Sequence, residues 1–383
     1  MAPLRNDNAA RDRDPPPPPD PPGPHPSFIQ VAKPYLFEQI IQECLTATGV
    51  SQLREDSIRL QGVTWIDNVR KALHLPVRTF NTAAVYYHKF RLVHPDSEYN
   101  YVDAAAAALF TACKIEDTLK KSRDILCSAY NLKYPPAEHL SPDDHLFESH
   151  SRGVIGLERL MLEASGFDFR NRHPQKLLLK LAKHYGFARD SEVTKVSYCM
   201  SLDLYRTFAP LKQTSATMSF TCLELARRLL DDKSEVEFAK DYLQWKTSRV
   251  EIMETLLDLL ELYTHHRSST SVGPDFPLDA FLAIRITLNQ EADTKKLPRF
   301  TIWKKNRALT NGSKAVNGSK GKDVQIPHNP MTPSSAVDVK GKPNERGRDG
   351  TVRFMLNPER AQTEKSTVSE YFKLEIEEYE AND

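Results

Sequence analysis

The sequence lacks most features that mark a particular class of protein. It has 5 cysteines in 383 residues and no CxxC pair, which argues against a disulfide framework or zinc knuckle and favours a reducing compartment. Its 14 glycines form no phosphate-binding loop and no GxSxG turn. No run of about 18 apolar residues is present, and the first residues, MAPLRNDNAARDRD, have no apolar core. We therefore expect neither a membrane span nor a secretory signal.

Net charge is also nearly absent. The 52 basic residues are balanced by 51 acidic ones, which leaves a formal charge of +1. Nucleic-acid binders are normally strongly basic, so the balance argues against a nucleic-acid partner for the whole chain and leaves a local basic patch open. The HExxH pair is missing as well, and no nucleophile has a matched base. We predict no catalytic residue and no cofactor.

Proline and charge divide the chain. Ten of the 26 prolines lie in residues 1–26, which predicts a disordered Pro-rich leader over 1–27, either a ligand for proline-binding grooves or a plain linker. Residues 295–322 hold nine basic residues and no acidic one, and the last fourteen residues hold six acids and one lysine. We expect a disordered tail over 290–383, whose basic run suits a nuclear import signal, a weak nucleic-acid contact or a solvated linker.

The body between leader and tail has helical periodicity almost throughout. A helix is predicted within 28–50, followed by five helices in 51–170 and five more in 171–289. The sequence therefore predicts an all-α fold with two tandem five-helix units. Five consecutive alanines at 104–108 predict a central helix, because alanine favours helices and its small side chain lets neighbouring helices approach closely.

One cluster of metal-ligating residue types lies before the fifth helix. Its members are His139, Asp143, Asp144, His145, Glu148 and His150. Their spacing could place two ligands on one helix face. However, Ser141 and Pro142 followed by acids are typical of a capped helix start, which explains the same residues. We predict no metal site.

Two charged residues do not fit their apolar surroundings. Glu158 has apolar neighbours at i−4, i−3, i+3 and i+4, and Lys114 follows an apolar stretch at the end of the alanine-rich helix. A carboxylate in such a place is costly unless it is paired. Either each side chain extends to water from the rim of its helix, or they pair with each other or with a partner. The pattern leaves these alternatives open.

A family resemblance rests on two motifs. LFTACKIED (109–117) and LERLMLEASGFDF (157–169) resemble the patterns that end the third helix and fill the fifth helix of a cyclin box. Within the cyclins, NTAAVYYHKF (81–90) and HPQKLLLKLAKHY (173–185) resemble the transcriptional types T, K, C and L. The Pro-rich leader and the long insert before the fifth helix resemble the beta subunits of fungal CTD kinases. The resemblance covers residues 50–265 and is specific in the first unit.

The resemblance implies two cyclin boxes and a regulatory subunit without catalysis of its own. It implies a cyclin-dependent kinase catalytic subunit as partner, room for a third subunit, and the C-terminal domain of RNA polymerase II as substrate of the complex, in the nucleus. Transcription elongation is the expected role, with a splicing-linked role as the alternative. The kinase-binding residues that the resemblance implies are Lys114, Glu158, Glu116 and Phe110.

Two other hypotheses remain at the level of the sequence. A cyclin-fold factor of the general transcription factor IIB type would carry a basic face that follows DNA phosphates, but the balanced charge speaks against it. A helical repeat scaffold would show self-similarity with a period of about 34–47 residues, which the sequence does not show. The helix VTWIDNVRKAL (63–73) also lacks an MRAIL-type motif, so docking of linear substrate motifs is not expected.

Overall fold

The structure is a computed structural model that describes residues 35–232 and 238–301, the strands at 28–30 and 352–354, and residues 363 and 366. The predicted leader over 1–27 and most of the predicted tail lie outside the described residues. None of the described helices is long and apolar enough to cross a membrane.

The chain divides into two compact units. The larger one, residues 30–333 and 342–351, holds the twelve α-helices of the described part of the chain, which confirms the all-α fold. The other, residues 1–29, 334–341 and 352–383, holds strand β2 (Val352–Phe354). This strand pairs with β1 (Phe28–Gln30) in a two-stranded sheet that the sequence did not predict.

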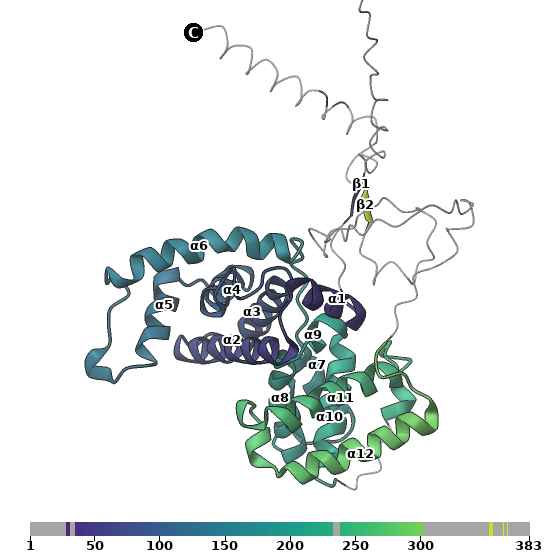
Figure 1. The fold of residues 1–383 in the computed structure, drawn as a ribbon. Coiled ribbons are helices and arrows are strands. Elements are labelled where there is room, and N and C mark those ends of the chain that lie inside the picture. The colour runs from purple at the N-terminus through teal and green to yellow at the C-terminus, as the bar shows by residue number, and fades with distance from the viewer. Residues whose placement is uncertain are drawn as a thin grey trace, which may run out of the picture. The chain divides into compact units, whose positions relative to one another are not determined.

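The first five-helix group is present in the predicted order (Figure 1). It comprises α2 (Gln52–Ala72), α3 (Val77–Arg91), α4 (Tyr101–Ile115), α5 (Ser122–Asn131) and α6 (Leu146–Ala164). Helix α4 is central and contacts each of the other four helices. All five alanines at 104–108 are fully buried, so their small side chains permit the close packing that was expected.

The start of α6 differs from the prediction. Ser141 does not cap this helix, whose N-cap residue is His145. The carboxylate of Asp144 instead accepts a hydrogen bond of 2.9 Å from the backbone amide of Leu146, so an acid still satisfies one free amide of the first turn. The helix ends at Ala164, and Gly166 just after it has a φ of 65°, which glycine adopts without strain.

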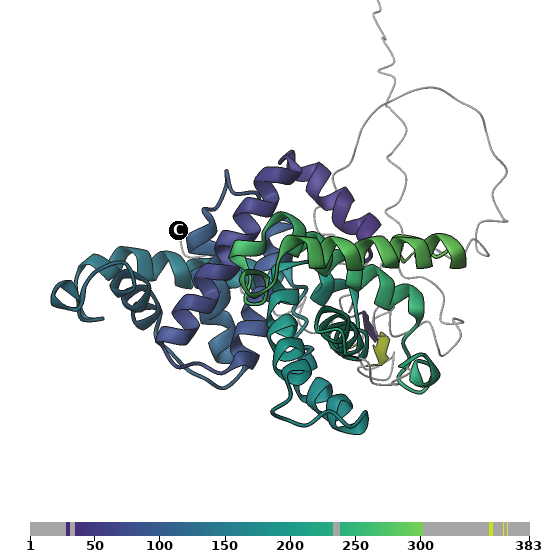
Figure 2. The same ribbon diagram turned by 90° about the horizontal axis from the view of Figure 1, so that it is seen from below.

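The second group follows the same plan with shorter elements. Its elements are α7 (Pro174–His184), α8 (Glu192–Asp203), the 3₁₀ helix η2 (Leu204–Arg206), α9 (Ala209–Lys212), α10 (Ser215–Leu229), the 3₁₀ helix η3 (Phe238–Asp241) and α11 (Arg249–His265). The second helix predicted for this group is split into α8 and η2, and the fourth is the 3₁₀ helix η3. An extra helix, α12 (Leu278–Lys295), packs on α10 and α11 (Figure 2).

Two boundaries differ from the expectation. The N-terminal helix α1 is shorter than the predicted 28–50, runs over Glu38–Thr48 and ends at Gly49, whose φ of 69° is left-handed. At the other end, helix α12 passes residue 290, and residues up to Thr301 pack against α11. The basic run begins inside this folded part, since Arg299 pairs with Asp258 at 2.8 Å.

Buried polar contacts join the two groups of helices. His88 of α3 is fully buried, and its Nε2 lies 2.8 Å from the carbonyl oxygen of Tyr205 in η2. Arg59 of α2 donates from Nε to the carbonyl of Arg206 at 3.1 Å and lies over the ring of Phe208. These contacts fix the second group against α2 and α3.

Candidate functional site

The two unusual charges identified in the sequence meet each other. Lys114 lies in the last turn of α4 and Glu158 in the middle of α6. The lysine Nζ donates to the Glu158 Oε2 over 2.7 Å. The side chains are 46% and 19% exposed respectively, so the pair is open to solvent on one side. Pairing within the chain is therefore the alternative that the structure confirms.

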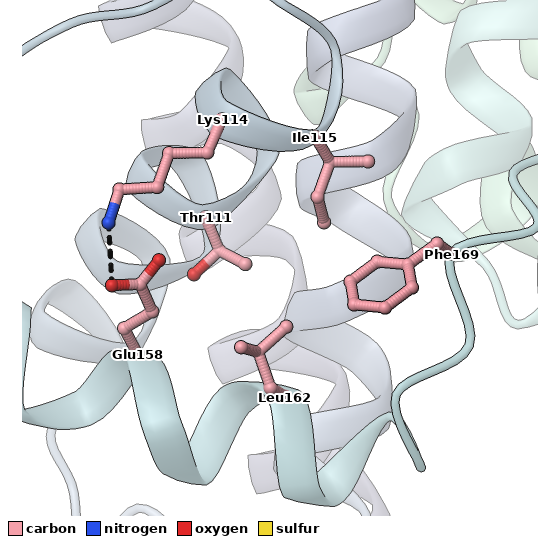
Figure 3. A pocket seen from close by; sticks show the side chains of 6 residues that line it. All are labelled: Thr111, Lys114, Ile115, Glu158, Leu162 and Phe169. Carbon is pink, nitrogen blue, oxygen red and sulfur yellow. Dashed lines mark hydrogen bonds and ion pairs between the residues drawn. The ribbon is translucent and has the colours of Figure 1, made fainter.

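The ion pair borders an open hollow of about 400 Å³ (Figure 3). Thr111 and Ile115 of α4 and Leu162 of α6 line it, and Phe169, from the segment after α6, points into it. The hydroxyl of Thr111 is buried and has no hydrogen-bond partner in the described part of the chain. The hollow thus combines an apolar floor, an unused hydroxyl and one pair of charges.

The ion pair contributes little to folding. Exposed pairs stabilise proteins by about 0–1 kcal/mol, because water already solvates both charges. Two of the four apolar neighbours of Glu158, Val154 and Met161, point into the core, whereas Ile155 is 52% exposed. The fold therefore gives no strong reason for a lysine and a glutamate here, which leaves both groups available to a partner.

The ring of Phe110 packs against the ammonium group of Lys114. It is only 7% exposed, and the Lys114 Nζ lies 4.3 Å from the centre of its ring. A cation over an aromatic face is attracted by the ring quadrupole, so Phe110 helps to direct the ammonium group toward Glu158. Its own surface available to a partner is small.

Glu116, the fourth predicted kinase-binding residue, contacts residues other than this pair. Its carboxylate accepts hydrogen bonds from Thr82 (2.6 Å) and Asn171 (3.2 Å) and lies 3.3 Å from the Nε2 of His173. These partners come from α3 and from the segment that joins the two helical groups. Burial lowers the pKa of His173, and the charge of Glu116 opposes that shift. The structure thus places Glu116 at the junction between groups, where its side chain is only 12% exposed.

Comparison with known proteins identifies the family. The family model described as "Cyclin, N-terminal domain" matches residues 35–170. A "CTD kinase subunit beta" from Schizosaccharomyces pombe is 30% identical over 282 residues, which cover 72% of this chain and 80% of the relative. The chain belongs to the cyclin family.

Further relatives of this cyclin are similar over shorter stretches. Cyclin-T1 from Homo sapiens is 26% identical over 218 residues, which cover 57% of this chain and 29% of the relative. A chain in the crystal structure of the yeast RNA Pol II CTD kinase CTDK-1 complex has the same fold, with a TM-score of 0.59 and 20% identity. The match covers 67% of this cyclin and 84% of that chain.

Two apolar residues of the site, Ile115 and Phe169, were not singled out individually from the sequence of the cyclin. Phe169 is 54% exposed and lies beside the hollow. The motif LERLMLEASGFDF contains both Glu158 and Phe169, so the motif could have indicated that Phe169 belongs to the site. Periodicity could not reveal the role of Phe169, because this residue follows the end of the helix.

The side chains of the histidine- and acid-rich segment 139–150 make local contacts. Among the described residues of the cyclin, no group of three or more His, Cys, Asp and Glu side chains could hold a metal ion. His139 instead lies with its Nε2 3.0 Å from the carbonyl of Tyr134, and Glu148 pairs with Arg152 at 2.7 Å. The local contacts therefore account for these residues.

Proposed function

We propose that this cyclin binds and activates a cyclin-dependent kinase that phosphorylates the C-terminal domain of RNA polymerase II. Support for this substrate comes from the S. pombe relative, a CTD kinase subunit beta, and from the fold shared with a chain of the yeast CTDK-1 complex. We further propose that the chain has no catalytic activity of its own, that it acts in the nucleus to promote transcription elongation, and that its complex can include a third subunit.

The observation that carries the kinase-binding site is the exposed pair of Lys114 and Glu158 beside an apolar hollow. Protein interfaces commonly combine a buried apolar centre with polar groups at the rim. Leu162, Ile115 and Phe169 supply the apolar surface, and the two charges supply direction. We propose Lys114 and Glu158 as the polar contacts to the kinase, with Phe110 holding the lysine in place. Glu116 acts indirectly by fixing the junction behind them.

Activation by such a surface is a shift of population. A kinase can transfer phosphate only when a glutamate of its αC helix pairs with the catalytic lysine. A cyclin surface that binds this arrangement more tightly than the inactive one increases its population by the ratio of the two affinities. The ion pair and the apolar hollow are suited to such selection. The charges bind well only when the partner's polar groups lie opposite them, and the hollow increases the apolar area that a partner buries.

The test is a double substitution, Lys114→Ala with Glu158→Ala, in the full chain co-expressed with its kinase. We expect kinase activity toward a substrate made of polymerase tail repeats to fall by roughly tenfold or more, since losing paired charges at a desolvated interface commonly costs about 2–5 kcal/mol. The thermal midpoint of the cyclin alone should barely change, because the pair is exposed.

The matched control is Arg159→Ala with Glu163→Ala, which removes another exposed ion pair of 2.8 Å from the same helix. This control should activate the kinase normally. If the Lys114 and Glu158 double variant also activates normally, the proposed contacts are wrong. If the unaltered chain stimulates no cyclin-dependent kinase that co-purifies with it from nuclei, the proposed function itself is wrong.

A further inference from the structure

Helix α7 presents three lysines whose charge the fold does not use. Lys176, Lys180 and Lys183 are all exposed, and their spacing of four and three residues places them on one face of the helix. The opposite face is the packing face, where Leu178 and Leu181 are fully buried. No hydrogen bond or ion pair of these three lysines occurs among the described residues. We call the three residues the α7 lysine row.

The start of this row is fixed at the junction between the two helical groups. Gln175 accepts a hydrogen bond of 2.8 Å from Asn81 of α3, which holds the first turn of α7 in place. The positive charges of Arg78 and Lys176 both contribute to the lowered pKa of His173, after the larger effect of burial. Arg78 itself pairs with Glu116 at 3.6 Å, so the unpaired positive charge is that of the row, whose like charges repel each other without any benefit to the fold.

We propose that the α7 lysine row binds phosphorylated peptides, in particular repeats of the polymerase tail that already carry phosphate. This inference rests on the proposed function, which makes such peptides the product of the complex. Phosphoserine carries a charge of about −2 and three acceptor oxygens, which suits a row of lysines. A bound product repeat would keep the neighbouring repeats close to the kinase and so favour repeated phosphorylation of one tail.

The geometry fits phosphates on an extended peptide. Lys176 and Lys183 are seven residues apart, which is about 10 Å along an α-helix. Two phosphoserines three residues apart in an extended peptide are also separated by about 10 Å. Single-stranded nucleic acid would in addition need aromatic side chains for base stacking, but the exposed residue between the lysines is Leu179. The surface therefore favours a phosphopeptide over RNA or DNA.

The test measures binding by the full chain without any kinase. A fluorescein-labelled peptide with two phosphoserines three residues apart is titrated at low ionic strength, and fluorescence anisotropy gives its Kd. The variant Lys176→Gln, Lys180→Gln, Lys183→Gln should bind it roughly tenfold or more weakly than the unaltered chain, since each lost charge contact costs up to about 1 kcal/mol. The unphosphorylated peptide should bind weakly to both proteins.

A matched control removes three exposed lysines elsewhere that likewise form no ion pair among the described residues, with Lys133→Gln, Lys246→Gln and Lys296→Gln, and should bind the phosphopeptide as the unaltered chain does. Equal binding by the α7 variant, or no preference for the phosphorylated peptide, overturns the inference. So does tighter binding of single-stranded RNA through the same lysines. Thermal midpoints of both variants verify that the fold is retained.

Failure of this inference can be told apart from failure of the proposed function. The variant Lys114→Ala with Glu158→Ala should keep its affinity for the phosphopeptide, because its altered residues lie on α4 and α6. If the unaltered chain activates a kinase but ignores phosphopeptides, only the lysine row is wrong. If the α7 row binds phosphopeptides but the chain activates no kinase, the row stands as a phosphopeptide site and the proposed function is overturned.

Discussion

This cyclin contains two lysine-centred ion clusters that differ in almost every respect. Lys114 is 46% exposed and pairs with a single carboxylate. Lys212 of α9 is 4% exposed and contacts Glu38 at 2.8 Å, Glu254 at 2.9 Å and Asp258 at 2.5 Å. The partners of Lys212 come from α1 and α11, so this second cluster joins the N-terminal helix to the second group of helices.

The difference shows how burial determines what an ion pair does. Burial alone would lower the pKa of Lys212, but the charges of Asp258, Glu254 and Glu38 outweigh that effect and raise its pKa above the usual value. Lys212 is thus kept charged inside the protein by three carboxylates. Water cannot easily reach these carboxylates to take the place of the lysine. At Lys114 water replaces a lost partner at little cost. We infer that the buried cluster holds the fold together and that the exposed one serves recognition.

The largest expected effect is on the buried cluster. Lys212→Met should lower the free energy of unfolding by about 3–5 kcal/mol, because it leaves buried carboxylates without a counter-charge. Adding Glu254→Gln should restore part of the loss, since it removes one of these carboxylates. Chemical denaturation monitored by circular dichroism measures both effects. Lys195→Met, which breaks an exposed pair with Glu192, is the control, and a similar loss there would show that burial does not distinguish the clusters.

The next effect concerns the exposed pair and its orientation. The swap Lys114→Glu with Glu158→Lys retains an ion pair within the chain but reverses the charges offered to a partner. We expect unchanged thermal stability and a loss of kinase activation of about tenfold to a hundredfold, equivalent to about 1.4–2.8 kcal/mol. Activation measured with the co-expressed kinase decides the point. Full activation by the swapped chain would mean that the pair serves the fold and not the partner.

A smaller effect is expected at the edge of the buried cluster. Arg299 is 34% exposed and donates to Asp258 over 2.8 Å and to Glu261 over 3.3 Å. Arg299→Gln should lower the free energy of unfolding by about 1–2 kcal/mol, because Lys212 still neutralises Asp258. Denaturant titration provides the value. A loss as large as that of Lys212→Met would place the centre of the cluster at Arg299 instead.

The smallest effect tests His88, a buried group that forms no ion pair among the described residues. Burial lowers the pKa of His88 to about 3 from its ordinary value of 6.5, although its hydrogen bond to the Tyr205 carbonyl opposes the shift. Between these values the unfolded chain binds the proton and the folded chain does not, so stability should fall as the pH falls. From pH 7 to 5.5 this amounts to about 1 kcal/mol.

The comparison with His88→Gln isolates that contribution. Glutamine can still donate to the Tyr205 carbonyl but does not titrate in this range, so the variant should lose about 1 kcal/mol less than the unaltered chain over the same interval. Free energies of unfolding at the two pH values provide the measurement. An identical pH dependence in both proteins would show that folding leaves the pKa of His88 unchanged.

The sequence revealed the exposed cluster and missed the buried one for a physical reason. Lys114 and Glu158 stand out because each lies among apolar neighbours on its own helix, and helical spacing makes those neighbours visible. Lys212 and Glu38 are 174 positions apart, and neither has unusual neighbours in the sequence. Their meeting depends on how the helices pack, which periodicity does not determine.

The same limit explains the boundaries that differed. The helices of the body were predicted because apolar spacing and stop residues such as Gly166 act locally. Arg299 was assigned to a polar tail, because composition alone cannot show that Asp258 and Glu261 lie opposite it. The short strands at 28–30 and 352–354 escaped prediction because three residues are too few for an alternating pattern. The phosphopeptide and kinase surfaces stay predictions until they are tested.

The contacts of Thr301 have a consequence for the topology of the chain. Its carbonyl accepts a hydrogen bond of 3.5 Å from Gln39 of α1, and its amide donates to Glu254 over 2.9 Å. The first turn of α1 and the segment that follows α12 therefore meet beside Glu254 of α11. A body whose ends adjoin can be closed by a short covalent bridge and opened at an exposed loop elsewhere. Circular permutants of residues 35–301 should thus keep both cyclin boxes, and a label or affinity tag could be moved to any surface loop of choice.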